Sequence, residues 1–303
     1  MRKLKVDKLA QLTGHDASIF KVTGFKEDHL FLSGAGDGWV VVWDLNAPDM
    51  GRLISKVDKQ IFSLLYLYGH EMILAGNMEG GIHWINLNEP DNTKNVAHHK
   101  NGVFAIERVG ESVFTAGGNG LLTRWDIKTT SSIESLHLSN KSLRSIAYSV
   151  ERNELAVGAS DQNIYLLDAT TLDLKDTIEA AHDNSVFTLQ YSPDNKYLVS
   201  GGRDAHLRVR NLENGYEQIN QQPAHWYTIN YLVYHPNGSI FATASRDKTI
   251  KLWDATTFQL LKVLDATRYG GHLNSVNHLY WSTYNNCLIS CSDDRSIILW
   301  SIE

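Results

Sequence analysis

The chain has 303 residues, of which 43% are hydrophobic and 20% charged, and its formal net charge is −6. This composition excludes a mainly disordered chain and disfavours generic nucleic-acid binding. The longest apolar stretch, residues 61–68, is too short to cross a bilayer, and the charged first residues are unlike a secretory signal. Cys287 and Cys291 suit two reduced thiols in the cytoplasm better than a disulfide framework.

Along the chain, one pattern recurs seven times. Each copy ends in a strand-like segment with an anchor position, which is tryptophan in five copies. The anchors are residues 43, 84, 125, 167, 210, 253 and 300, separated by 41 to 47 residues. Each copy contains four short strand-like segments divided by Gly, Pro, Asn or Asp, most clearly in residues 224–264. A repeat of this length with four strands predicts the blades of an all-β propeller.

Three polar positions precede the anchor at fixed distances. In most copies a histidine stands 28 residues before it, Ser or Thr 10 residues before it, and Asp 6 residues before it. In the third copy the histidine stands 26 residues before the anchor. With their anchors, these residues are His15, Ser33, Asp37, Trp43, His99, Thr115, Trp125, His182, Ser200, Asp204, His225, Thr243, Asp247, Trp253, His272, Ser290, Asp294 and Trp300. The second and fourth copies depart from the pattern, and there we expect apolar packing to replace a polar network.

This combination, which reads Gly14-His15, Ser33, Asp37 and Trp43-Asp44 in the first copy, resembles the repeat of WD40 proteins over essentially the whole chain. The resemblance implies an all-β, seven-bladed β-propeller of four-stranded antiparallel blades. It also implies that each histidine bonds the aspartate of its blade, which is thereby oriented toward Ser or Thr and the tryptophan indole. We therefore interpret these histidines as structural rather than catalytic or metal-binding.

The repeat also sets the expected boundaries within a single propeller domain. We expect blades at residues 13–57, 58–97, 98–138, 139–180, 181–223, 224–264 and 271–303. The last blade ends three residues after Trp300 and therefore lacks a fourth strand. Because an open ring would expose strand edges, we expect residues 4–12 to complete this blade and close the ring.

The central channel is where a propeller enzyme would place metal ligands or carboxylates. At the two rim positions of each inner strand the sequence has no Asp, Glu, His or Cys, which disfavours a channel enzyme. One of these positions is phenylalanine in four copies, namely Phe20, Phe62, Phe104 and Phe187. Two interpretations remain open, because these rings either pack inside the propeller or form an aromatic mouth that accepts a side chain of a partner.

Basic residues are predicted on the same face, over blades four to seven. They are Arg144 at a rim position, Arg203 and Arg246 in turns, and Arg268 in an enlarged link before the last blade. One interpretation is scattered, solvated arginines, and the other is a partner that presents an acidic or phosphorylated group beside an apolar one. The predicted partner-binding set also contains Tyr227, Asn230 and Asn277.

These observations favour a non-enzymatic protein-interaction scaffold that binds a peptide or protein loop on the channel-rim face. The alternative is an obligate structural subunit of a larger complex, and a more remote one is an enzyme that uses the channel. We predict no catalytic residue, no metal and no cofactor. The expected partner is a protein or peptide, without membrane or nucleic-acid contact, and the chain is expected to be cytoplasmic and monomeric when free.

Overall fold

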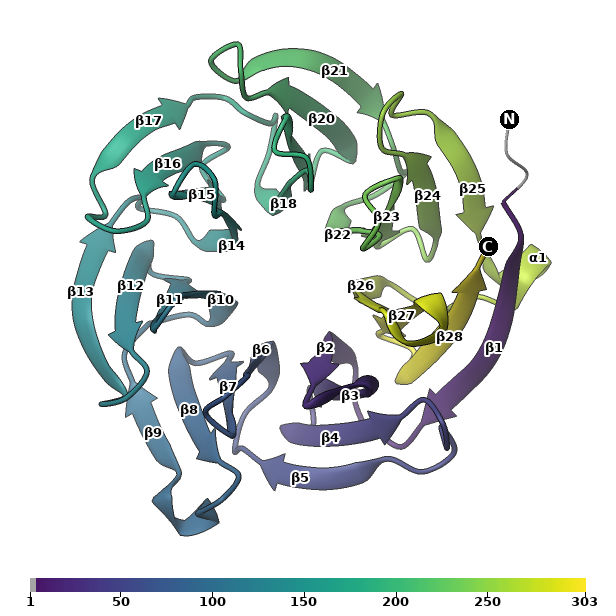
Figure 1. Cartoon of the computed structure of the whole chain (residues 1–303), viewed down its shortest axis with the longest axis horizontal. Coiled ribbons are helices and arrows are strands. Elements are labelled where there is room, and N and C mark those ends of the chain that lie inside the picture. The colour runs from purple at the N-terminus through teal and green to yellow at the C-terminus, as the bar shows by residue number, and fades with distance from the viewer. Residues whose placement is uncertain (1–3) are drawn as a thin grey trace.

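The computed structural model describes residues 4–303, which form seven four-stranded antiparallel sheets arranged as the blades of a ring (Figure 1). The fold is therefore the all-β, seven-bladed propeller that the repeat predicts. Helical segments are short, namely α1 (Ala266–Tyr269) and two 3-10 turns, Pro90–Asn92 and Tyr284–Asn286. Within residues 4–303, no helix has the length and apolar character needed to span a membrane.

In each of the first four blades the strands follow the chain from the central channel to the circumference. Blade 1 contains β2 (Ile19–Phe25), β3 (Glu27–Ala35), β4 (Trp39–Asp44) and β5 (Arg52–Lys56). Blade 2 contains β6 (Ile61–Leu67), β7 (Met72–Asn77), β8 (Gly81–Asn86) and β9 (Lys94–Ala97). Blade 3 contains β10 (Val103–Val109), β11 (Ser112–Gly117), β12 (Leu121–Asp126) and β13 (Ser131–His137). Blade 4 contains β14 (Leu143–Ser149), β15 (Glu154–Ala159), β16 (Ile164–Asp168) and β17 (Leu174–Ile178).

Blades 5 and 6 repeat this order, and blade 7 takes its outer strand from the other end of the chain. Blade 5 contains β18 (Val186–Tyr191), β19 (Tyr197–Gly202), β20 (His206–Asn211) and β21 (Glu217–Pro223). Blade 6 contains β22 (Ile229–Tyr234), β23 (Ile240–Ser245), β24 (Ile250–Asp254) and β25 (Leu260–Leu264). Blade 7 contains β26 (Val276–Ser282), β27 (Cys287–Ser292), β28 (Ser296–Ile302) and β1 (Val6–Thr13).

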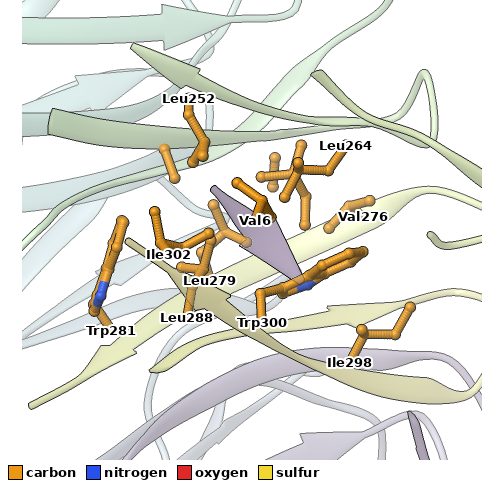
Figure 2. Close-up of a cluster of buried hydrophobic side chains, with 13 residues drawn as sticks. Val6, Leu252, Leu264, Val276, Leu279, Trp281, Leu288, Ile298, Trp300 and Ile302 are labelled. Carbon is orange, nitrogen blue, oxygen red and sulfur yellow. The ribbon is translucent and has the colours of Figure 1, made fainter. Parts of the chain in front are cut away.

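The hydrophobic core lies between neighbouring blades. Every residue of the middle strand β15 is buried, whereas the outer strand β13 is mostly exposed. Both faces of a middle strand are covered because each blade packs against two others. Figure 2 shows one such cluster, in which Leu252 and Leu264 of blade 6 meet Trp281 and Trp300 of blade 7.

The N-terminal strand closes the ring, as the missing fourth strand of the last blade predicts. Strand β1 pairs antiparallel with β28, from Val6 opposite Ile302 to Thr13 opposite Ser296. Val6 packs into the cluster between blades 6 and 7, and Leu12 packs into the cluster that blade 7 shares with blade 1. The two ends of the chain are therefore held together by sheet hydrogen bonds and by two hydrophobic interfaces.

A chain of hydrogen bonds, which we call the lock, ties the strands of blade 1 together. Burial lowers the pKa of His15, so its imidazole is neutral and donates from Nδ1 to Asp37 (2.8 Å). Its Nε2 accepts from the Ser33 hydroxyl (2.7 Å), and the Trp43 indole donates to the same hydroxyl oxygen (2.8 Å). Blades 6 and 7 contain the same arrangement around His225, Thr243, Asp247, Trp253, His272, Ser290, Asp294 and Trp300.

Blades 3 and 5 contain shortened versions of this network. In blade 3, Thr115 accepts the Trp125 indole proton (2.9 Å) and contacts His99 (2.7 Å), while an asparagine replaces the aspartate. In blade 5, His182 joins Asp204 (3.0 Å) to Ser200 (2.8 Å), but the anchor is Arg210. The guanidinium of Arg210 donates to the carbonyl of Ala181 instead (3.1 Å).

The expectation that blades 2 and 4 rely on apolar packing alone is wrong. In blade 2 the Asn77 amide donates to His83 (3.0 Å), which in turn contacts Asn95. In blade 4 the hydroxyls of Ser139 and Tyr165 both donate to Asp161. Each blade therefore has a polar network of its own, built from residue types that the repeat pattern does not contain, because buried polar groups must find partners.

A β-bulge near the start of every inner strand shapes the channel. The pairing register of the inner strand with its neighbour shifts at one residue in all seven blades. The residues skipped by the register are Phe20, Phe62, Phe104, Arg144, Phe187, Asn230 and Asn277. A bulge turns a side chain out of the regular alternation. We call these seven residues the mouth residues.

Candidate functional site at the channel mouth

The inner strands enclose a cavity of about 310 Å³ at the centre of the ring. All seven mouth residues line it. In six blades the residue that follows the mouth residue lines it as well. In a regular strand these two neighbours would face opposite sides, so the bulges explain why both reach one cavity.

The four phenylalanines of the mouth line this cavity, and three of them pack against one another. The ring of Phe62 contacts Phe20 edge-on, with a centroid distance of 5.1 Å, and stacks on Phe104 at 5.6 Å. The Phe104 ring lies over Gly102 (φ +103°), where a Cβ atom would come within 3.0 Å of the ring. All four rings, including Phe187, are half-buried. They are thus partly packed and partly exposed, and their acceptance of a side chain of a partner stays a prediction.

Arg144 continues the aromatic arc from blade 3 to blade 5. Its guanidinium lies 4.0 Å from the ring centre of Phe104 and 5.2 Å from that of Phe187. Its Nε donates to the hydroxyl of Ser160 (3.0 Å), and no salt bridge of Arg144 occurs within residues 4–303. Burial and the nearby charge of Arg203 lower the pKa of Arg144. The group still carries a charge at neutral pH, since an arginine begins above 12.

The remaining two mouth residues form a hydrogen-bonded arc of amides. Asn230 donates to the hydroxyl of Ser275 (3.0 Å) and to the carbonyl of Val276 (2.8 Å), which joins blade 6 to blade 7. Asn277 donates to the carbonyl of Ile19 (2.9 Å), which joins blade 7 to blade 1. These amides have protein partners, so their geometry serves ring closure at the mouth.

The predicted basic face is only partly assembled. Arg203 and Arg246 are exposed, and Arg203 lies near enough to Arg144 to perturb its pKa. Arg268 lies on α1, at the circumference beside β1 (Figure 1). The prediction that Arg268 gathers with the other arginines is therefore wrong, because the enlarged link bends into a helical turn against the outer strand, where Lys8 donates to Gly270 (2.6 Å).

Exposed apolar side chains lie next to the mouth on blades 6 and 7. Trp226 and Tyr227 in the loop before β22 are 87% and 61% exposed. Leu273 occupies the position of Trp226 in blade 7 and is 67% exposed. Leu273 was not predicted from the sequence, although the residue after the repeat's histidine marks this position in every complete copy. In both blades the backbone N–H of this residue donates to the aspartate of the lock, which fixes the loop.

Sequence reasoning missed a group of ionisable and aromatic residues below the mouth. We call Lys21, Glu107, Tyr231 and His278 the deep cluster, and all four line the cavity. Lys21 Nζ donates to His278 Nε2 (2.6 Å) and lies 5.0 Å from the ring centre of Tyr231. The rings of Tyr231 and His278 stack with centroids 3.5 Å apart.

Burial in the cavity changes the protonation of this cluster. It lowers the pKa of Lys21 to about 8 and holds that of His278 well below its usual range. It also raises the pKa of Glu107 to about 7, against the opposing effect of the Lys21 charge. At neutral pH a largely charged lysine therefore donates to a neutral imidazole. The channel does contain an acid and a histidine, Glu107 and His278, at positions other than the two rim positions of each inner strand. Within residues 4–303, no three His, Cys, Asp or Glu side chains are grouped as a metal site.

Seven four-stranded blades, the Gly-His and Trp-Asp signatures and the internal lock define a repeat-built propeller with a lined central cavity. The family profile described as WD domain, G-beta repeat matches residues 7–44, 174–211, 216–254 and 262–301. The chain belongs to the WD40 family.

Similar proteins share the propeller at low sequence identity. The chain is 22% identical to protein tipD of Dictyostelium discoideum over 95% of its own length and 48% of that protein, so it spans about half of this relative. It is 24% identical to the human serine-threonine kinase receptor-associated protein, over 82% of this chain and 69% of that one. The WD40 propeller of Doa1 superposes with a TM-score of 0.86 at 18% identity, covering 98% of this chain and 97% of that one. This likeness shows the fold.

Proposed function

We propose that this protein is a non-enzymatic interaction scaffold that binds a peptide or protein loop at the channel mouth. The observation that carries this proposal is the arc of four half-buried phenylalanines around a cavity, continued by the stacked guanidinium of Arg144. Such an arc offers an apolar side chain a surface that already excludes water on several sides. The name of one relative, the serine-threonine kinase receptor-associated protein, describes an association with another protein, which supports a binding role.

The charges beside the arc specify the expected partner further. Arg144, Arg203 and Arg246 have no salt bridge within residues 4–303. We therefore propose that the partner carries an acidic or phosphorylated group next to its apolar side chain, since guanidinium groups bind such anions with two parallel hydrogen bonds. Trp226 and Tyr227 extend the apolar surface outward over blade 6.

We propose that the chain acts in the cytoplasm and is monomeric when free. Large apolar side chains on the outer strands are exposed one by one around the ring, not as a single patch. They are Leu9, Leu53, Ile133, Leu174, Ile219 and Leu260, each on a different blade. An obligate subunit would need a larger continuous apolar surface. This distribution favours the scaffold over the permanent subunit.

Selection from a random peptide library, followed by affinity measurements on the enriched peptides, tests the proposal. We expect Phe62→Ala to weaken binding about thirtyfold, which corresponds to ~2 kcal/mol. Arg203→Glu should weaken it more at low salt than at high salt, because ions screen the charge. Ile133→Ala, on the outer strand β13, is the matched control and should bind normally. Enriched peptides that bind Phe62→Ala and Arg203→Glu as tightly as the unmodified chain would show that the mouth is not the site.

A further inference from the structure

The ammonium group of Lys21 is an incompletely paired charge in the cavity. It has three N–H donors. One donates to His278 Nε2, and the face of Tyr231 lies beside the group, but Nζ makes no other hydrogen bond and no salt bridge within residues 4–303. A charge removed from water is costly unless it is paired, so this ammonium favours an anionic partner.

Glu107 does not fill that role. It is the one carboxylate that lines the cavity within the described residues, and it lies on β10, across the channel from β26 and two blades away from β2 (Figure 1). It does not approach Lys21 within salt-bridge distance. Its raised pKa leaves it about half protonated near neutral pH. The lysine charge is therefore not neutralised by the protein itself.

The imidazole of His278 holds the Lys21 ammonium in the cavity. Its Nε2 accepts from Lys21, so the neutral ring carries its proton on Nδ1. This Nδ1 is buried on the edge of the ring that points away from Lys21, beside the backbone of Leu279. A ligand in the cavity therefore meets the remaining N–H donors of the ammonium, and their complement is an oxygen anion.

We propose that the deep cluster binds a carboxylate whose aliphatic part lies between the mouth phenylalanines. One carboxylate pairs with the ammonium of Lys21, while the guanidinium of Arg144 in the same cavity is stacked between Phe104 and Phe187. The rings of Phe20, Phe62 and Phe104 suit an apolar chain rather than a hydrated headgroup. The carboxylate comes either from a small aliphatic acid or from an acidic side chain of a partner. The site goes beyond the scaffold proposal, because a small acid needs no protein partner.

Calorimetric titration of the full chain with butyrate tests this site, with butyramide as the neutral probe of the same shape. The titration is done near pH 6, where Lys21 and Arg144 are charged, Glu107 is mostly protonated and the side chains of Tyr231 and His278 are neutral. We expect butyrate to bind and butyramide not to bind. Lys21→Met should weaken butyrate binding at least tenfold. Lys128→Met, which changes a lysine that is exposed on a turn after β12, is the matched control and should change nothing.

A second arm separates the two sources of the carboxylate and does not depend on the fold of a variant. The capped tripeptide acetyl-Gly-Glu-Gly-amide and its Gln counterpart replace the small acids, and the labelling rate of Lys21 by acetic anhydride is followed by mass spectrometry in the unmodified chain. Slower labelling with butyrate alone assigns the site to small acids, and slower labelling with the Glu peptide but not the Gln peptide assigns it to acidic side chains. If neither carboxylate slows labelling of Lys21 or binds in a Lys21-dependent way, the carboxylate site does not exist. Weaker binding of the library peptides to Phe62→Ala would still support the scaffold proposal after that result, so the two proposals fail separately.

Discussion

Replacement of Asp247 by alanine tests whether the lock of blade 6 holds the sheet together. Asp247 accepts four hydrogen bonds, from His225 Nδ1 (2.8 Å), from the backbone of Trp226 (3.1 Å) and from the backbone and hydroxyl of Thr249 (3.0 and 2.7 Å). The donors of Trp226 and Thr249 can bond to water once the carboxylate is removed. The His225 side chain is fully buried, so its donor is left without a partner.

The magnitude follows from that difference. Losing a hydrogen bond to a charged group costs roughly 1.5–3 kcal/mol, and we expect about 3 kcal/mol for Asp247→Ala with its loop contacts included. Near the unfolding midpoint this is roughly 5 °C for a chain of this length. Denaturant titration followed by circular dichroism gives the free energy of unfolding.

Asp161→Ala in blade 4 is the matched comparison. Asp161 accepts from the hydroxyls of Ser139 and Tyr165, which can rotate toward other acceptors, and no histidine depends on it. We expect a loss of about 1–2 kcal/mol, smaller than for Asp247→Ala. Equal losses in the two variants would refute the reasoning that the buried imidazole sets the cost.

Three further outcomes follow from the structure. Deletion of residues 1–12 should abolish soluble, cooperatively melting protein, because it exposes the edge of β28 and opens two core clusters. A truncated chain that is soluble and melts cooperatively would contradict this prediction. The free energy of unfolding should fall as pH drops below about 6.5. Burial lowers the pKa of His225 and brings that of His99 to about 4, so in this range only the unfolded chain takes up these protons. Melting temperatures that stay flat down to pH 4.5 would exclude this effect. Gly102→Ala should displace the Phe104 ring and weaken mouth binding several-fold. It should also lower the melting temperature, because φ +103° strains an alanine, and unchanged peptide affinity would show that the ring position is unimportant.

The sequence predicts the fold well because the propeller repeats one solution seven times. The same local structure is indicated by strand periodicity, by turn residues and by the positions of His15, Asp37 and Trp43. A wrong strand assignment in one copy is therefore corrected by comparison with the others. Ring closure follows from counting strands. The networks of blades 2 and 4 could not be predicted in this way, because His83 and Tyr165 meet their partners through side-chain geometry that has no counterpart in the other copies.

The mouth phenylalanines could be predicted from the repeat, whereas the residues below them could not. The position shared by Phe20 and Phe62 is visible in the repeat, and the structure places both at the cavity. Lys21 and His278 stand one residue further, where strand alternation would turn them away from the channel. The bulge reverses that expectation, and a register shift between two strands leaves no mark in the sequence of either one.

The bulges also separate what stabilises this propeller from what it can bind. The lock residues join the middle strands and the loops of each blade, whereas the mouth residues leave the sheet pairing at the innermost strand. A substitution at the mouth therefore removes a contact across the channel without breaking a ladder of hydrogen bonds. Seven independent positions thus surround one cavity, and here they provide five aromatic or cationic groups on consecutive blades and two amides that bond to the neighbouring blades. The asymmetry of this ring, on a scaffold of nearly equal blades, is the physical reason to expect that a ligand enters in one orientation.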